Sequence, residues 1–138
     1  MATGITTAKT KFEWKVGTGA AVKIGGVVSF SGLGGGSSAV IDTTDFDSTA
    51  KEKAMGLPDE GQVSLSMILI PGDAGQTALG AARSAQTKGT LIITLSDKTI
   101  YTQDAFVLTF ERNGEQDDVA KASCNLEITG AIVQSKGV

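Results

Sequence analysis

Three acidic residues, Asp42, Asp45 and Asp47, lie close together in this sequence. Carboxylate oxygens are the ligands that Ca²⁺ prefers, so the spacing raises the question of a calcium site. A calcium loop of the EF-hand type also has a central glycine and a closing glutamate at fixed positions, and this segment has neither. The sequence therefore favours a solvated or interfacial acidic loop over a metal site.

The sequence gives little support for a catalytic site, because it has no histidine to serve as a general base. Cys124 lies on the apolar face of an expected strand, which is typical of a small core residue. The glycine tract 32–36 lacks the lysine and the following helix of a phosphate-binding loop, so it is better explained as a hinge. We expect no enzyme, no cofactor, no metal and no small-molecule substrate.

The length of 138 residues is that of one domain. The net charge of −3 does not indicate a nucleic-acid-binding surface. One cysteine excludes an internal disulfide. No apolar run is long enough to cross a membrane, and the N-terminal segment lacks the apolar core of a signal peptide. We expect one domain over residues 1–138, made in a cytoplasm, with flexible tails at about 1–10 and 134–138.

The periodicity of apolar residues predicts a mainly β fold. Asp73 and Gln76 form a capping-box pattern that predicts one helix over residues 74–86. In the strand expected over 100–111, Phe106, Leu108 and Phe110 are predicted to share one face. We expect an antiparallel β-sandwich or barrel-like pair of sheets with one flanking α-helix. The other strands are expected at residues 11–16, 20–31, 62–70, 90–95 and 120–132.

The longest connection between these elements is an arm at residues 37–61, which holds six acidic residues and two lysines. A long connection is usually functional or disordered, and the apolar residues within the arm argue against disorder. Thr49 and Glu52 predict about one turn of helix inside it. We expect the arm to become ordered against another chain. Its candidate contact residues are Ile41, Asp42, Asp45, Phe46, Asp47, Lys51, Glu52, Met55, Leu57 and Pro58.

The last strand is apolar on one face and polar on the other, a pattern that could line an aqueous space. Basic residues are not clustered, so a grip on DNA through its phosphates is not expected. The candidate residues for lining such a space are Lys121, Ser123, Asn125, Glu127 and Thr129.

Several segments, in this order and spacing, resemble the major tail tube proteins of long flexible-tailed bacteriophages of the lambda type and of phage-like gene transfer agents. The most specific are VIDTT at 40–44, DSTAKEK at 47–53 and GLPDEG at 56–61. Weaker similarities are found at residues 10–14, 24–32, 73–76, 95–98, 105–107 and 126–132.

The resemblance implies a β-sandwich with a flanking helix, related in fold to the tube component of type VI secretion. It implies a structural protein of the virion tail, assembled in the cytoplasm of the host bacterium. Rings of six copies would stack into a hollow tube around a tape-measure protein, and DNA would later pass through the lumen. Tail terminator and baseplate or tip proteins would be further partners. The arm would make ring and stacking contacts, and the polar face with Glu127 would line the lumen.

Two other hypotheses stay open at this point. A related ring component of a tail or secretion apparatus, such as a tail completion or baseplate protein, would form single rings. A β-sandwich binding module would stay monomeric and would usually carry a secretion signal.

Overall fold

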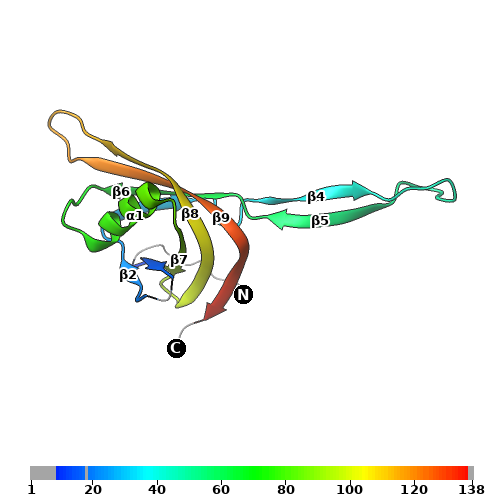
Figure 1. Ribbon diagram of the computed structural model, residues 1–138, viewed down its shortest axis with the longest axis horizontal. Helices are drawn as coiled ribbons and strands as arrows, with labels where there is room; N and C mark the ends of the chain where they lie inside the picture. Colours follow the sequence, from blue (N-terminus) through cyan, green and yellow to red (C-terminus); the bar gives the residue numbers. More distant parts are fainter. Residues whose placement is uncertain (1–8, 18, 137–138) are drawn as a thin grey trace.

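The computed structural model describes residues 9–17 and 19–136, which contain one antiparallel sheet of seven strands and a separate pair of strands (Figure 1). The strand order in the large sheet is β2-β1-β7-β8-β9-β6-β3. A mainly β chain with a flanking helix was predicted, and this is confirmed. The strands of the large sheet are β1 (Lys11–Val16), β2 (Val22–Lys23), β3 (Val27–Ser31), β6 (Gln62–Ile68), β7 (Lys88–Thr94), β8 (Thr99–Asn113) and β9 (Lys121–Lys136); β4 (Ser37–Asp42) pairs with β5 (Lys53–Asp59), and the helix is α1 (Ala74–Ala85).

The large sheet curls into a barrel-like form, because its two edge strands, β2 and β3, are joined by only residues 24–26. At this crossing the Ile24 N–H donates to the Phe12 carbonyl at 2.7 Å, and the Ile68 N–H donates to Gly26 at 2.8 Å. Gly26 has a φ of 76°, a conformation that glycine adopts at little cost. The single strand expected over residues 20–31 is therefore two strands on opposite edges of the sheet, separated by a bend at Gly25 and Gly26.

The curled sheet encloses the core, and α1 packs against β1, β2 and β8. Cys124 is buried among apolar side chains, and this burial raises the pKa of its thiol to about 12. A thiol with so high a pKa is a poor nucleophile at neutral pH. The buried apolar residues are Phe12, Trp14, Ile24, Val63, Leu65, Met67, Leu79, Ala82, Leu91, Ile93, Ala105, Val107, Phe110, Ala122, Cys124, Leu126 and Ile128.

The face predicted for β8 is wrong in part, because a β-bulge lies between Val107 and Thr109. Phe106 and Leu108 are exposed on the outer surface, whereas Phe110 is buried. One extra residue in a strand shifts the alternation of its side chains, so both Val107 and Phe110 reach the core.

The C-terminal tail predicted from residue 134 is wrong for residues 134–136. β9 continues to Lys136, and its last residues pair with the start of β8, where Lys136 lies opposite Thr99. The backbone hydrogen bonds of this ladder hold the segment in the sheet. The remaining parts of the two predicted tails, residues 1–8 and 137–138, lie outside the described residues.

The helix α1 begins at the predicted N-cap, where the Asp73 carboxylate accepts hydrogen bonds from the N–H groups of Gln76 and Gly25, both at 3.0 Å. Gln76 does not close a capping box. Its amide donates instead to the carbonyls of Gly25 and Ile68 at 2.8 and 2.9 Å, and accepts from the Ile70 N–H at 2.9 Å. This buried side chain therefore fastens the start of the helix to the crossing between the sheet edges.

A second buried glutamine, Gln103, lacks such bonds. Its side-chain amide is 1% exposed and has no hydrogen-bond partner within residues 9–17 and 19–136. Leaving a buried polar group unpaired costs about 1–3 kcal/mol. We expect Gln103→Leu to raise the free energy of unfolding by about this amount, and the matched change Gln76→Leu to lower it similarly.

Urea unfolding of the two variants would measure both changes. The Trp14 indole N–H is also buried without a partner in the described part of the chain. A loss of stability in Gln103→Leu would contradict the prediction and would indicate that buried water satisfies the Gln103 amide.

Candidate functional site

The acidic residues that raised the question of a metal site serve a different purpose. Within the described ranges, no group of three or more histidine, cysteine, aspartate or glutamate side chains is placed to hold a metal ion. The same residues include no helix with the length and apolar character needed to cross a membrane. The surface features that stand out are the arm, the polar face of β9 and a groove at the root of the arm.

The arm is a β-hairpin that projects away from the large sheet (Figure 1). Its strands pair from Ser37–Asp59 at the root to Asp42–Lys53 near the tip, a length of about 20 Å. At the root, Gly36 lies so close to the other strand that a Cβ would overlap the Asp59 carbonyl. The glycine tract therefore allows close approach of the two strands, rather than the free hinge that was expected.

The arm forms a hairpin within the single chain, and its ordering against another chain stays a prediction. One further expectation for the arm is wrong. The helical turn at Thr49–Glu52 is absent from the described arm, because Glu52 continues the hairpin. Its N–H donates to Thr44 Oγ1 at 2.7 Å, and its carbonyl accepts from the Thr43 N–H at 2.9 Å.

The arm exposes its apolar side chains. Val40 and Met55 are cross-strand partners, and they are 67% and 77% exposed. Leu57 and Phe46 are still more open, at 92% and 108%. Contiguous exposed apolar surface marks an interaction site in a soluble protein, and a lone two-stranded hairpin is only marginally stable in water. The arm therefore has the character of a contact element whose partner lies outside its own chain.

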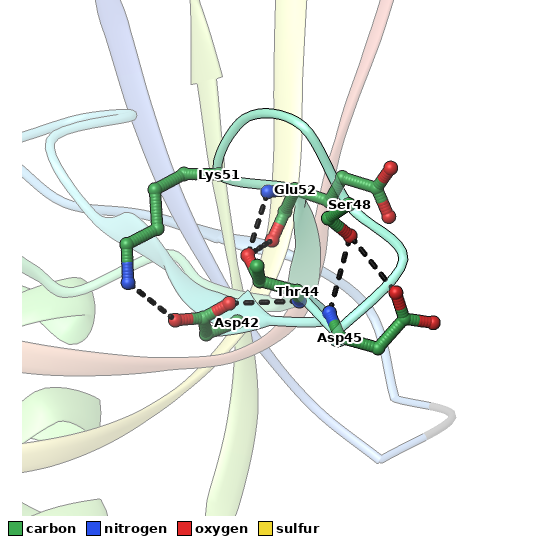
Figure 2. A network of polar contacts seen from close by, with 6 residues as sticks. All are labelled: Asp42, Thr44, Asp45, Ser48, Lys51 and Glu52. Atoms are coloured by element: carbon green, nitrogen blue, oxygen red, sulfur yellow. Dashed lines mark hydrogen bonds and ion pairs between the residues drawn. The ribbon is translucent and has the colours of Figure 1, made fainter.

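Polar contacts hold the tip of the arm in one shape (Figure 2). The Asp42 carboxylate accepts from the Thr44 N–H at 2.9 Å and lies 3.7 Å from Lys51 Nζ. Hydrogen bonds to Thr44, and the contact with Lys51, lower the pKa of Asp42. Asp42 is therefore ionised at neutral pH and fixes the start of the tip loop.

Asp45 also stabilises the tip loop, three residues further along the chain. Its carboxylate accepts from the Ser48 hydroxyl at 3.1 Å (Figure 2). The same carboxylate accepts from the Asp47 N–H at 3.0 Å. The Asp45 N–H in turn donates to Ser48 Oγ at 3.1 Å. These bonds form a tight turn with Phe46 at its apex, so that the aromatic ring is presented to solvent.

All ten predicted arm residues lie in this one projection, between Ile41 on β4 and Pro58 on β5. Each of them is exposed. Val40 was not among the candidates. Its position beside Met55 depends on the pairing of two strands across a bulge, which the order of residues does not reveal.

The five polar residues predicted on β9 lie together on its outer face. Ser123, Asn125 and Glu127 stand opposite Ser66, Ser64 and Gln62 of β6. The Ser64 hydroxyl donates to Asn125 Oδ1 at 2.7 Å. Lys121 is partly neutralised by Asp118, at 3.3 Å. Lys121, Ser123, Asn125, Glu127 and Thr129 thus form part of a continuous polar surface.

A groove of about 350 Å³ lies at the root of the arm, and sequence reasoning missed it. Its apolar side chains come from β3, β8, β9 and the turns beside β3 and β7, so only the folded sheet brings them together. These side chains are partly buried and pack against the core. The lining residues are Phe30, Leu33, Gly34, Glu60, Leu95, Tyr101 and Ile132.

We expect the amides of β4 and β5 to exchange rapidly with solvent in the free subunit, because nothing in the described chain covers the arm. Amides of β6 and β9, which pair inside the large sheet, should be strongly protected. Hydrogen exchange read by mass spectrometry on the dilute protein would measure both. Protection of β4 and β5 equal to that of β6 would contradict the prediction.

A family model described as "Phage tail tube, TTP, lambda-like" matches residues 5–103. Among solved structures, the tail tube of SPP1 is similar, with a TM-score of 0.70 and 15% identity, covering 98% of this chain and 81% of that one. The sheath/tube terminator of the PVC extracellular contractile injection system gives 0.72 and 16%, covering 97% and 98%. The tail of a gene transfer agent particle, refined with C6 symmetry, gives 0.67 and 14%, covering 90% and 95%. No match was found among curated protein sequences.

Proposed function

Because the chain belongs to the family of lambda-like phage tail tube proteins, we propose that six copies form a ring and that the rings stack into a hollow tube. As a member of this family the chain is a structural component of the virion tail, and it is not an enzyme. The number six is supported by the C6 symmetry of the similar gene transfer agent tail.

The arm is the observation that carries the proposal. It exposes apolar side chains that a stable monomer would cover, and hydrogen bonds within the chain give its tip a compact turn. The arm on one side of the subunit must meet a different surface on the next copy. Such heterologous contacts generate rings when the rotation closes and stacks when it does not.

The polar face of β9 is proposed to line the lumen. A channel that passes DNA should not bind phosphates, and the acidic Glu127 together with a partly neutralised Lys121 suits this requirement. Within the tube we propose a tape-measure protein during assembly and DNA in transit afterwards. Tail terminator and baseplate or tip proteins are proposed to cap the two ends.

Electron microscopy of the purified protein at rising concentration tests the proposed function. Long hollow tubes support it. Single rings would favour a tail completion or baseplate component. A monomer at every concentration would refute assembly through the arm.

The lumen assignment predicts a difference in the accessibility of thiols. In assembled tubes, a Ser123→Cys variant should react with a small maleimide but hardly at all with maleimide coupled to a large dextran. The matched control is Gly80→Cys on α1, which we expect to face the outside of the tube. This variant should react with both reagents. The native Cys124 is buried and should not interfere. Equal reaction of Ser123→Cys with both reagents would overturn the lumen assignment.

A further inference from the structure

We propose that Phe46, at the tip of the arm, inserts into the apolar groove at the arm root of a second copy of this chain. The inference rests on the proposed function, since it requires assembly. It names the two surfaces that meet: an aromatic side chain held at the apex of a fixed turn, and the cavity beside Phe30 and Leu33.

The two surfaces match in chemistry. Phe46 makes no contact that shields it from solvent, and the hydrogen bonds of Asp45 hold its turn in place. The groove is lined mainly by apolar and aromatic side chains, including Phe30, Leu95 and Tyr101. Aromatic anchors that fill preformed pockets contribute most of the binding free energy in many interfaces.

The same chain cannot fill its own groove with its own tip. The groove includes Leu33, Gly34 and Glu60, which flank the root of the hairpin, whereas Phe46 lies beyond its far end. The paired strands separate root from tip by about 20 Å. Each subunit therefore offers one tip and one groove, which is the arrangement that a repeating contact between copies requires.

The net charge of the arm disfavours a contact between two arms and so agrees with insertion of the tip into the groove. Residues 37–61 hold six acidic and two basic side chains, a net charge of −4, whereas the rest of the chain, with nine acidic and ten basic, carries +1. Lys98 lies in the turn beside Leu95, and Lys136 lies opposite Thr99 at the same end of the sheet. The acids at this end are Glu60, in the groove wall, and Asp97, whose pKa is lowered by hydrogen bonding to Thr99 and by the charge of Lys136. The charges at the groove balance, whereas two arms of net charge −4 repel each other, so contact between arms is disfavoured and the groove can accept an acidic tip.

Cysteine cross-linking tests the contact directly. Phe46→Cys and Leu33→Cys are made in separate chains and mixed before assembly, so that a disulfide between the introduced thiols can form only between copies. We expect a covalent dimer in the mixed tubes. The matched control pairs Phe46→Cys with Val119→Cys, which is exposed in the connection between β8 and β9 and should give no such dimer. Tubes that form without the Phe46–Leu33 cross-link would overturn the inference.

A second measurement does not depend on cysteine geometry. Phe46→Ala should raise the critical concentration for tube formation by about ten-fold to a hundred-fold, and Phe46→Leu should restore most of the loss. Circular dichroism of the dilute variant confirms that it folds. An unchanged critical concentration for Phe46→Ala would refute the role of the ring while leaving the proposed function intact. If the unaltered protein formed no tubes, both proposals would fail.

Discussion

Replacing residues 38–58 with an Asn-Gly turn is expected to give a folded subunit that no longer forms tubes at any concentration. The change removes the paired strands of the arm and its tip, including Phe46, Met55 and Leu57. These side chains are at least 77% exposed and belong to no core cluster. Loss of the main contact surface should therefore abolish assembly without loss of the fold.

The design follows the geometry of the arm root. Ser37 and Asp59 are paired neighbours, so a two-residue turn of the Asn-Gly type can join them directly. The close approach of Gly36 to Asp59 is kept, as is the hydrogen bond from the Ile128 N–H to the Gly61 carbonyl at 2.9 Å. We expect the free energy of unfolding to change by no more than about 0.5 kcal/mol, as for surface changes elsewhere.

Sedimentation and electron microscopy measure assembly, and urea unfolding measures the fold. Ala50→Ser is the control for the tip, because this exposed residue takes no part in the network around Asp42 and Asp45. The control should assemble like the unaltered protein. Tubes formed by the shortened subunit would show that the arm is not the assembly element, and an unfolded variant would show that the arm contributes to the core.

The sequence predicted the elements whose residues are set by a local pattern. The strand expected over residues 11–16 is confirmed as β1, in which Phe12 and Trp14 are buried, although Val16 on the same alternation is 49% exposed. The same alternation separated the two faces of β9 correctly over residues 121–129. The arm could be recognised as a contact element because acidic and apolar residues occur together in a long connection between strands.

Other features depend on contacts between distant segments, and the sequence could not reveal them. The bulge beside Leu108 changes which aromatic side chain is buried, and it becomes apparent only when β8 is aligned with β9. Thr49 and Glu52 have the spacing of a capping box, but backbone pairing with Thr43 and Thr44 determines the conformation of Glu52. The groove requires five separate segments to meet.

Gly89 is a single residue whose role also depends on a contact with a distant segment. The strand expected over residues 90–95 begins earlier, at Lys88, so Gly89 lies inside β7. It is buried on the core face of β7, two residues before Leu91. A Cβ at this position would overlap the indole ring of Trp14, which is itself fully buried and has no free space to move into. By β propensity alone, a valine here would appear to improve the strand.

We therefore expect Gly89→Val to lower the free energy of unfolding by about 3 kcal/mol, at the upper end of what overpacking costs. Urea unfolding would measure the loss. Gly114→Val, where no atom lies within 4 Å of the added Cβ, should change stability by no more than about 0.5 kcal/mol. If the clash with the indole is the cause, adding Trp14→Leu should cost less in the Gly89→Val background than in the unaltered protein. Strictly additive losses would show that Gly89 is needed for another reason, such as backbone freedom.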